Sequence, residues 1–195
     1  MPEFERTAGK PRPILRGQDR HQREKDRVRL SESQRRGVTA PELVFHAEYD
    51  TEPASESLAA AFRVPTGAKL LKRTYRTGAR ADETPLSLVR SYLRYEQVAV
   101  NPALLDAGNE PWPGGTQHQL GTLGIEIDRV TDRITARAPS AEEISDLELA
   151  AGVPVFELRK TSIDIRDRVV EVADMILPAD RTEFFYTTRL CRWQA

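Results

Sequence analysis

Two copies of one structural pattern, offset by 85 residues, organise this sequence. At that offset Ser55 aligns with Ser140 and Gly67 aligns with Gly152. Each copy has the same order of elements: an amphipathic helix, a glycine, a strand, a turn and a second strand. Two such units that share one antiparallel sheet predict an α+β domain with helices on one side and an internal two-fold repeat.

The boundaries of the elements follow from local signals. The helix that starts after Ser140 has a capping box, because Glu143 follows three residues later. Antiparallel hairpins, together with the lack of a GxGxxG or Walker lysine motif, argue against a nucleotide-binding parallel sheet. Helices are predicted over 54–64, 102–105, 116–123 and 140–149, strands over 68–76, 85–93, 125–137, 153–165, 169–177 and 182–190, a turn over 77–84 and a loop over 108–115.

The N-terminal part of the chain differs in composition from the rest. Residues 1–36 hold eleven Lys or Arg and six Asp or Glu, and only seven residues of this stretch are apolar. So little apolar surface does not offset the conformational entropy of ordering a segment. We therefore predict a charged flexible tail or linker over 1–40 and a globular domain over 41–192. The basic charge suits either a solvated linker or an arm that contacts DNA phosphates.

Composition and motifs exclude several classes of protein. No apolar run approaches the roughly 20 residues of a membrane-spanning helix, and the N-terminus does not resemble a signal peptide. The single Cys191 forms no intramolecular disulfide, and no Cys/His spacing suggests a zinc site. No HExxH or GxSxG motif is present. We expect a cytoplasmic protein with no membrane contact, no metal and no cofactor, and not an enzyme.

Polar side chains on the predicted strands are the feature that points to binding. Because side chains alternate along a strand, Arg73 and Tyr75 share one face, and Arg129, Arg133 and Arg137 share a face of their own strand. A sheet face rich in arginine and hydroxyl groups is able to hold an anionic or sugar-like ligand. The same pattern also fits a solvated face on which arginines pair with acidic residues across strands.

Several segments together resemble the UTRA domain, the effector-binding domain of GntR-superfamily regulators of the HutC type. The resemblance covers about residues 45–190, and the segment NEPWPGGT is similar to the corresponding segment of actinobacterial members. The segments that carry it are GAKLLKRTYR (67–76), Asp82 with Pro85, SYL (91–93), NEPWPGGT (109–116), ARAPSAEE (136–143), GVPV (152–155), VEVAD (170–174) and PADR (178–181).

This resemblance implies a chorismate lyase-like fold with a six-stranded antiparallel sheet. It also implies a transcriptional regulator in which a small-molecule effector alters operator affinity, and it implies a homodimer. Operator DNA would be bound through an N-terminal winged helix-turn-helix, and we expect no such domain in the residues before Ala40. An alternative is a chorismate lyase-like enzyme that acts on a small carboxylate, since that fold is shared.

The effector pocket is predicted on the sheet face that carries Arg73 of the first hairpin. Arg73, Arg133 or Arg137 would clamp an anionic group, and Ser91 and Tyr75 would donate hydrogen bonds. Glu171 would accept from a hydroxyl or amine, and Tyr186 would form a flat wall. The effector is expected to be a sugar, a phosphosugar or a carboxylate. A second candidate anion site is the glycine-rich turn Gly114–Thr116. The seven predicted site residues are Arg73, Tyr75, Ser91, Arg133, Arg137, Glu171 and Tyr186.

Overall fold

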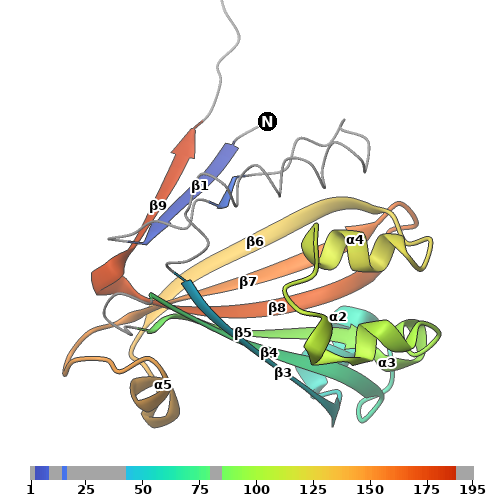
Figure 1. Cartoon of the computed structure of the whole chain (residues 1–195), viewed down its shortest axis with the longest axis horizontal. Coiled ribbons are helices and arrows are strands. Elements are labelled where there is room, and N and C mark those ends of the chain that lie inside the picture. The colour runs from blue at the N-terminus through green and yellow to red at the C-terminus, as the bar shows by residue number, and fades with distance from the viewer. Residues whose placement is uncertain (1–2, 9–14, 17–42, 80–84, 188–195) are drawn as a thin grey trace, which may run out of the picture.

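A six-stranded antiparallel sheet forms the centre of the domain (Figure 1). The computed structural model describes residues 3–8, 15–16, 43–79 and 85–187. The strand order is β3-β4-β5-β8-β7-β6. This confirms the predicted antiparallel α+β architecture. The strands are β3 (Leu43–Pro53), β4 (Lys69–Ala79), β5 (Pro85–Arg94), β6 (Ile127–Arg137), β7 (Val155–Asp164) and β8 (Val169–Pro178).

The predicted repeat is visible in this strand order. One half is β3, α2 (Glu56–Phe62), β4 and β5, and the other is β6, α5 (Ala141–Asp146), β7 and β8. The halves meet where β5 pairs with β8, so the order is symmetric about the centre of the sheet. Ser55 caps α2 by accepting from the backbone N–H of Leu58, and Ser140 caps α5 with the complete capping box.

The two repeat helices cover the same face of the sheet. Leu58 and Phe62 of α2 pack against Leu70 of β4 and Val172 of β8. Leu147, directly after α5, is buried with Leu88 and Ile176 of the two central strands. The two helices of the repeat therefore lie on the same side of the sheet. The prediction of helices on one side does not hold for the predicted helices over 102–105 and 116–123, which pack on the other face.

The connection between the halves forms a second layer on the opposite face. It contains α3 (Tyr95–Val98), η2 (Pro102–Leu105), η3 (Ala107–Asn109) and α4 (Gly115–Gly121). Leu104 and Leu120 from this layer are buried with Leu71 of β4 and Leu93 of β5. Figure 1 shows α3 and α4 lying over the sheet at one end of the domain. These elements create the covered sheet face on which the polar site lies.

Some strands differ from the sequence-based expectation. The predicted strand over 125–137 is β6 (Ile127–Arg137), and it lies at an edge of the sheet, because both hairpins place their second strand in the middle. β3 (Leu43–Pro53) was not predicted and forms the other edge. The predicted turn residues 80–84, including Asp82, lie outside the described residues.

A second, three-stranded sheet has the order β2-β1-β9. β1 (Glu3–Ala8) and β2 (Leu15–Arg16) fall within the segment that we predicted as a tail, and β1 pairs with β9 (Thr182–Thr187). The last short helix is η4 (Ala179–Arg181). Among the described residues, no helix is both long enough and apolar enough to cross a bilayer.

Candidate functional site

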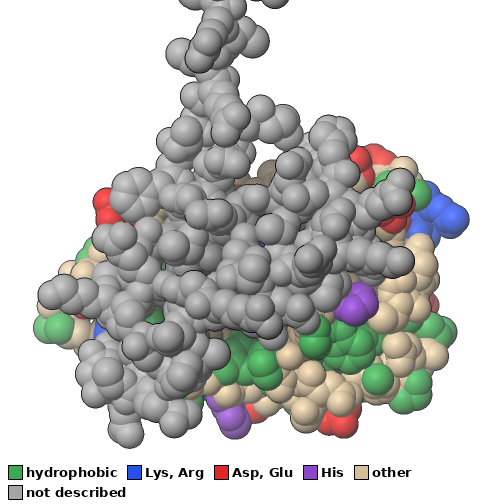
Figure 2. Space-filling model, turned by 45° about the horizontal axis from the view of Figure 1, so that its top comes forward, with side chains coloured by type: hydrophobic (Ala, Val, Ile, Leu, Met, Phe, Trp, Pro, Cys, Tyr) green, Lys and Arg blue, Asp and Glu red, His purple; other side chains and the backbone are tan. Residues whose placement is uncertain are grey.

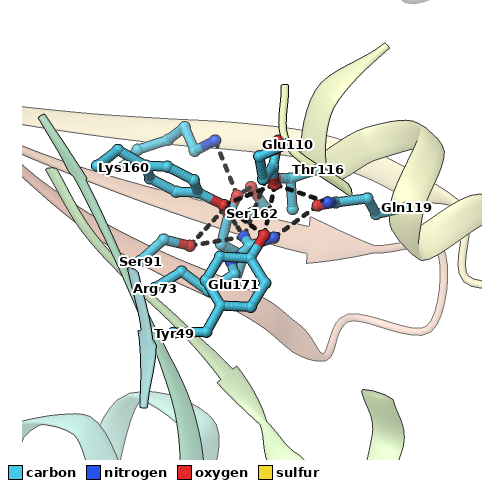
Figure 3. A network of polar contacts seen from close by, with 10 residues as sticks. Tyr49, Arg73, Ser91, Glu110, Thr116, Gln119, Lys160, Ser162 and Glu171 are labelled. Atoms are coloured by element: carbon cyan, nitrogen blue, oxygen red, sulfur yellow. Dashed lines mark hydrogen bonds and ion pairs between the residues drawn. The ribbon is translucent and has the colours of Figure 1, made fainter. Parts of the chain in front are cut away.

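The side chain of Arg73 lies at the centre of a buried polar network (Figure 3). Its solvent exposure is only 1%, although it projects from the middle of β4. One terminal nitrogen donates to Gln119 Oε1 at 2.6 Å. The other donates to Ser91 Oγ at 2.7 Å, to Thr116 Oγ1 at 3.0 Å and to Glu171 Oε1 at 3.0 Å. The guanidinium therefore connects three strands and helix α4.

The register of the sheet brings these residues together. Arg73 of β4 lies opposite Tyr49 of β3 and Ser91 of β5, so the three side chains project to the same face. Ser91 in turn lies opposite Ala173 of β8, which places Glu171 two residues along on that face. Thr116 and Gln119 come from α4, which begins at Gly115, and both Gly115 and the preceding Gly114 have positive φ, 62° and 81°. This close turn is favourable only for glycine.

Glu171 is an ion with all its acceptor positions in use. Besides Arg73, its Oε1 accepts from Ser91 at 2.8 Å. Its Oε2 contacts Lys160 Nζ at 2.8 Å and accepts from Ser162 at 3.0 Å. Burial raises the pKa of Glu171, but the charges of Lys160 and Arg73 outweigh burial and lower this pKa to about 2. Both oxygens are thus engaged with the protein. Glu171 holds Arg73 in position rather than offering a free acceptor to a ligand.

A second carboxylate, that of Glu110, lies beside this network and is bound by neutral donors. Its Oε1 accepts from Tyr49 at 2.5 Å, from Tyr75 at 3.0 Å and from Gln119 Nε2 at 2.9 Å. Its Oε2 accepts from the backbone N–H of Trp112 at 2.7 Å. Burial raises the pKa of Glu110, but these hydrogen bonds dominate and lower it. Glu110 is consequently an anion at neutral pH.

The two tyrosines remain hydroxyl donors over the physiological pH range. Burial raises the pKa of Tyr49 and, more strongly, the pKa of Tyr75. The ring of Tyr75 stacks on Phe45 at a centroid distance of 5.6 Å, and the guanidinium carbon of Arg73 lies 5.7 Å from the centroid of the Tyr75 ring. The site therefore combines cations, protonated hydroxyls and aromatic surface, the groups that bind anionic or hydroxylated small molecules.

Arg73 has unused donor capacity. Its Nε atom is buried, and no hydrogen-bond partner for this atom is found in the part of the chain that the structure describes. A buried donor without a partner is costly. This donor is able to bind an acceptor atom of a ligand.

Four of the seven predicted site residues meet in the network, namely Arg73, Tyr75, Ser91 and Glu171. Arg133 and Arg137 do not share this face, contrary to expectation. Through the pairing of β6 with β7, they lie on the face that α2 and α5 cover. Arg137 forms a two-pronged ion pair with Glu143, each contact 2.7 Å long, and Arg133 is solvent-exposed. The error has a simple cause: the face of a strand depends on its register, which residue spacing alone does not determine.

Tyr186 lies in β9 opposite Phe4, in the three-stranded sheet, and its side chain is outside the described part of the protein. Five members of the network were not predicted from the sequence. Tyr49 has a detectable signal, because Phe45, Ala47 and Tyr49 alternate with polar residues as in a strand. The turn Gly114–Thr116, which was predicted as a second candidate anion site, contributes Thr116 as an acceptor for Arg73. The five members without a prediction are Tyr49, Glu110, Gln119, Lys160 and Ser162.

Other kinds of site have little support in the described residues. They contain no group of three or more His, Cys, Asp or Glu side chains arranged to hold a metal ion. In the described part of the face shown in Figure 2, hydrophobic side chains lie among acidic, basic and neutral ones. That visible part therefore does not form the continuous basic patch that contacts to nucleic acid phosphates need.

The antiparallel sheet with its internal repeat and its helical layers defines a chorismate lyase-like α+β domain. The sequence matches the UTRA domain over residues 46–183, so the chain belongs to the UTRA family. This family occurs in transcriptional regulators, and the comparisons support a regulatory domain rather than an enzyme.

Known proteins similar to this chain are regulators. The chain is 37% identical over 124 residues to an uncharacterized HTH-type transcriptional regulator of Streptomyces coelicolor, which covers 62% of this chain and 44% of the relative. It is 32% identical over 163 residues to another such regulator from Rhizobium meliloti, covering 80% of this chain and 62% of the relative. A GntR-family regulator from Enterococcus faecalis has a similar fold, with a TM-score of 0.63 and 16% identity over 75% of this chain and 100% of that chain. This chain thus spans about half the length of the two curated relatives.

Proposed function

We propose that this chain is the effector-sensing part of a GntR/HutC-type transcriptional regulator, in which a small molecule bound beside Arg73 modulates DNA binding. The observation that carries the proposal is the buried guanidinium of Arg73, which is held by side chains from β5, β8 and α4 and still has a free donor. Buried, fully positioned arginines with spare donors suit recognition of carboxylate, phosphate and sugar oxygens.

The arrangement gives a ligand a means of acting on the rest of the domain. Arg73 joins β4 and β5 of one repeat half to β8 of the other, and α4 closes over it. A ligand that binds one arrangement of these elements more tightly shifts the population toward that arrangement. The operator would be contacted by a separate winged-helix domain, as the HTH-type relatives suggest by their name and greater length.

A thermal-shift screen of sugars, phosphosugars and carboxylic acids tests the proposal, since a ligand that binds only the native state raises the melting temperature. Calorimetry then compares the wild type with Tyr75→Phe and Thr116→Val, each of which removes one hydroxyl of the network. We expect each to weaken binding by about 0.5–1.5 kcal/mol, the usual net contribution of one hydrogen bond.

The matched control is Arg133→Ala, because Arg133 lies on the other face of the sheet. It should leave the affinity unchanged. Weaker binding in Arg133→Ala, with unchanged binding in the two network variants, would move the effector site to the face of α2 and α5.

We further propose that the domain is a homodimer. Among the described strands, β3 and β6 form the two edges of the sheet without a further pairing partner, and the side chains of β6 are partly or fully exposed. Open edges are usually covered in native proteins. Light scattering at tens of micromolar protein should give twice the 22.0 kDa chain mass, and a monomer mass would contradict the proposal.

A further inference from the structure

The carboxylate of Glu110 accepts hydrogen bonds from side chains that belong to other elements of the fold. Tyr49 projects from β3, Tyr75 from β4 and Gln119 from α4, and all three converge on the single oxygen Oε1 of Glu110 (Figure 3). No Lys or Arg side chain is recorded in direct contact with Glu110 among the described residues. The donors therefore form a neutral pocket for one carboxylate oxygen.

The donors are fixed more firmly than the carboxylate that they hold. Gln119 is 2% exposed, and its Oε1 accepts from Arg73, so its NH₂ group has to face Glu110. Tyr75 is held between Phe45 and Arg73. Glu110, by contrast, lies between η3 and α4, in a connection without regular helix or strand over residues 110–114. Departure of the connection would move Glu110, whereas Tyr49 and Tyr75 would stay in place on strands β3 and β4.

An emptied pocket would need another acceptor. Without Glu110, the hydroxyls of Tyr49 and Tyr75 and the amide of Gln119 would lose their common partner in a partly buried place. Each buried donor left without a partner carries a substantial penalty. An oxygen of a ligand carboxylate would restore all three hydrogen bonds.

The charges of the network favour a ligand anion that replaces the carboxylate of Glu110 over one that binds in addition to it. Arg73 and Lys160 are the cations, and both already contact Glu171, while Glu110 is the second anion. A further anion placed beside Glu110 would be repelled at short range in a medium of low dielectric. An anion that takes the place of Glu110 leaves the balance unchanged.

We propose that Tyr49, Tyr75 and Gln119 form a carboxylate pocket, that Glu110 fills it in the ligand-free domain, and that the effector is a carboxylic acid whose carboxylate displaces Glu110. This inference rests on the proposed function, because it names the chemical class of the effector and the group that the effector competes with. Displacement would also release the connection before α4, and thereby couple occupancy of the pocket to the position of the helical layer.

The test is rescue of Glu110→Ala by acetate, which requires no knowledge of the effector. Melting temperatures are measured in sodium acetate, sodium phosphate and sodium chloride at equal pH and ionic strength. At an acetate concentration about tenfold above its dissociation constant, acetate should raise the melting temperature of Glu110→Ala by roughly 3–5 °C relative to chloride. The wild type, whose pocket is filled, should show no acetate-specific shift.

The control variants separate the pocket from general salt effects. Glu142→Ala removes an exposed carboxylate with 70% side-chain exposure and should show no acetate-specific shift. Adding Tyr49→Phe to Glu110→Ala removes one donor and should reduce the acetate response. If Glu110→Ala does not melt cooperatively, Glu110→Ser, which keeps one polar group and leaves room for acetate, is measured by the same criterion.

The outcomes distinguish this inference from the proposed function. Equal melting temperatures of the Glu110 variant in acetate and chloride overturn the carboxylate pocket, and stabilisation by phosphate but not acetate overturns the choice of carboxylate. If acetate stabilises the Glu110 variant but the thermal-shift screen finds no effector, the carboxylate pocket is supported and effector sensing is contradicted. An effector without a carboxyl group that binds beside Arg73 would support effector sensing and overturn the inference.

Discussion

Arg73 and Glu171 are 98 residues apart in the chain, yet their side chains are joined by a hydrogen-bonded ion pair of 3.0 Å in the interior of the domain. Both side chains are about 1% exposed. Arg73 belongs to the first repeat half and Glu171 to the second, so the pair connects the two halves across β5. It is the contact on which the organisation of the candidate site depends.

Removal of the charge of Glu171 should destabilise the domain strongly. Glu171→Gln leaves Arg73 and Lys160 without their anion, and breaking a buried ion pair on one side typically costs about 3–5 kcal/mol. The free energy of unfolding in urea, at neutral pH, measures the loss. Glu142→Gln breaks the exposed contact with Arg90 instead and should cost less than about 1 kcal/mol. Similar small losses in both variants would mean that the buried pair does not stabilise the fold.

Stability should fall in acid because of the same carboxylate. The pKa of Glu171 is about 2 in the folded protein, against an ordinary value of 4.5. A lowered pKa stabilises the fold fully above about 4.5, and this stabilisation is lost as the pH falls from 4.5 toward 2. The shift corresponds to about 3 kcal/mol as an order of magnitude. The difference in unfolding free energy between the wild type and Glu171→Gln should therefore shrink between pH 5 and pH 3, and a constant difference would contradict the assignment.

The two helix caps of the repeat should contribute similarly. Ser55→Ala and Ser140→Ala each remove the side-chain acceptor of a helix N-terminus, which typically costs about 1 kcal/mol. Ser→Thr at either position keeps the hydroxyl and should retain most of the stability. Because the two caps share no partner, the double alanine variant should lose about the sum of the single losses in urea unfolding.

Deletion of residues 1–40 should leave the six-stranded domain folded. Among the described residues, the buried members of the hydrophobic clusters lie between Ala54 and Ile176, so the deletion removes none of these. We expect an unfolding free energy within about 2 kcal/mol of the full chain, less than the loss of one or two buried side chains. A greater loss would show that the pairing of β1 with β9 supports the domain.

The residues of the candidate site were harder to predict than the fold. Strand alternation correctly predicted that Arg73 and Tyr75 share a face, because both lie on one strand, where the two-residue side-chain period alone determines the face of each residue. It failed for Arg133 and Arg137, because β6 turned out to be an edge strand whose register puts its arginines on the opposite face. Glu110 was not predicted because its carboxylate reaches the tyrosines from a loop, and loop conformation has no periodic signal.

The sequence by itself determined the elements and their repetition. Local signals such as the Ser140–Glu143 capping box and the positive-φ glycines Gly67 and Gly152 act within a few residues, so the order of helices, turns and hairpins could be predicted from them. Tertiary structure alone decided which residues form the site. The contacts of Arg73 with Gln119 and Glu171 span 46 and 98 residues, and they exist only because strand register and the packing of α4 bring distant segments into one buried space.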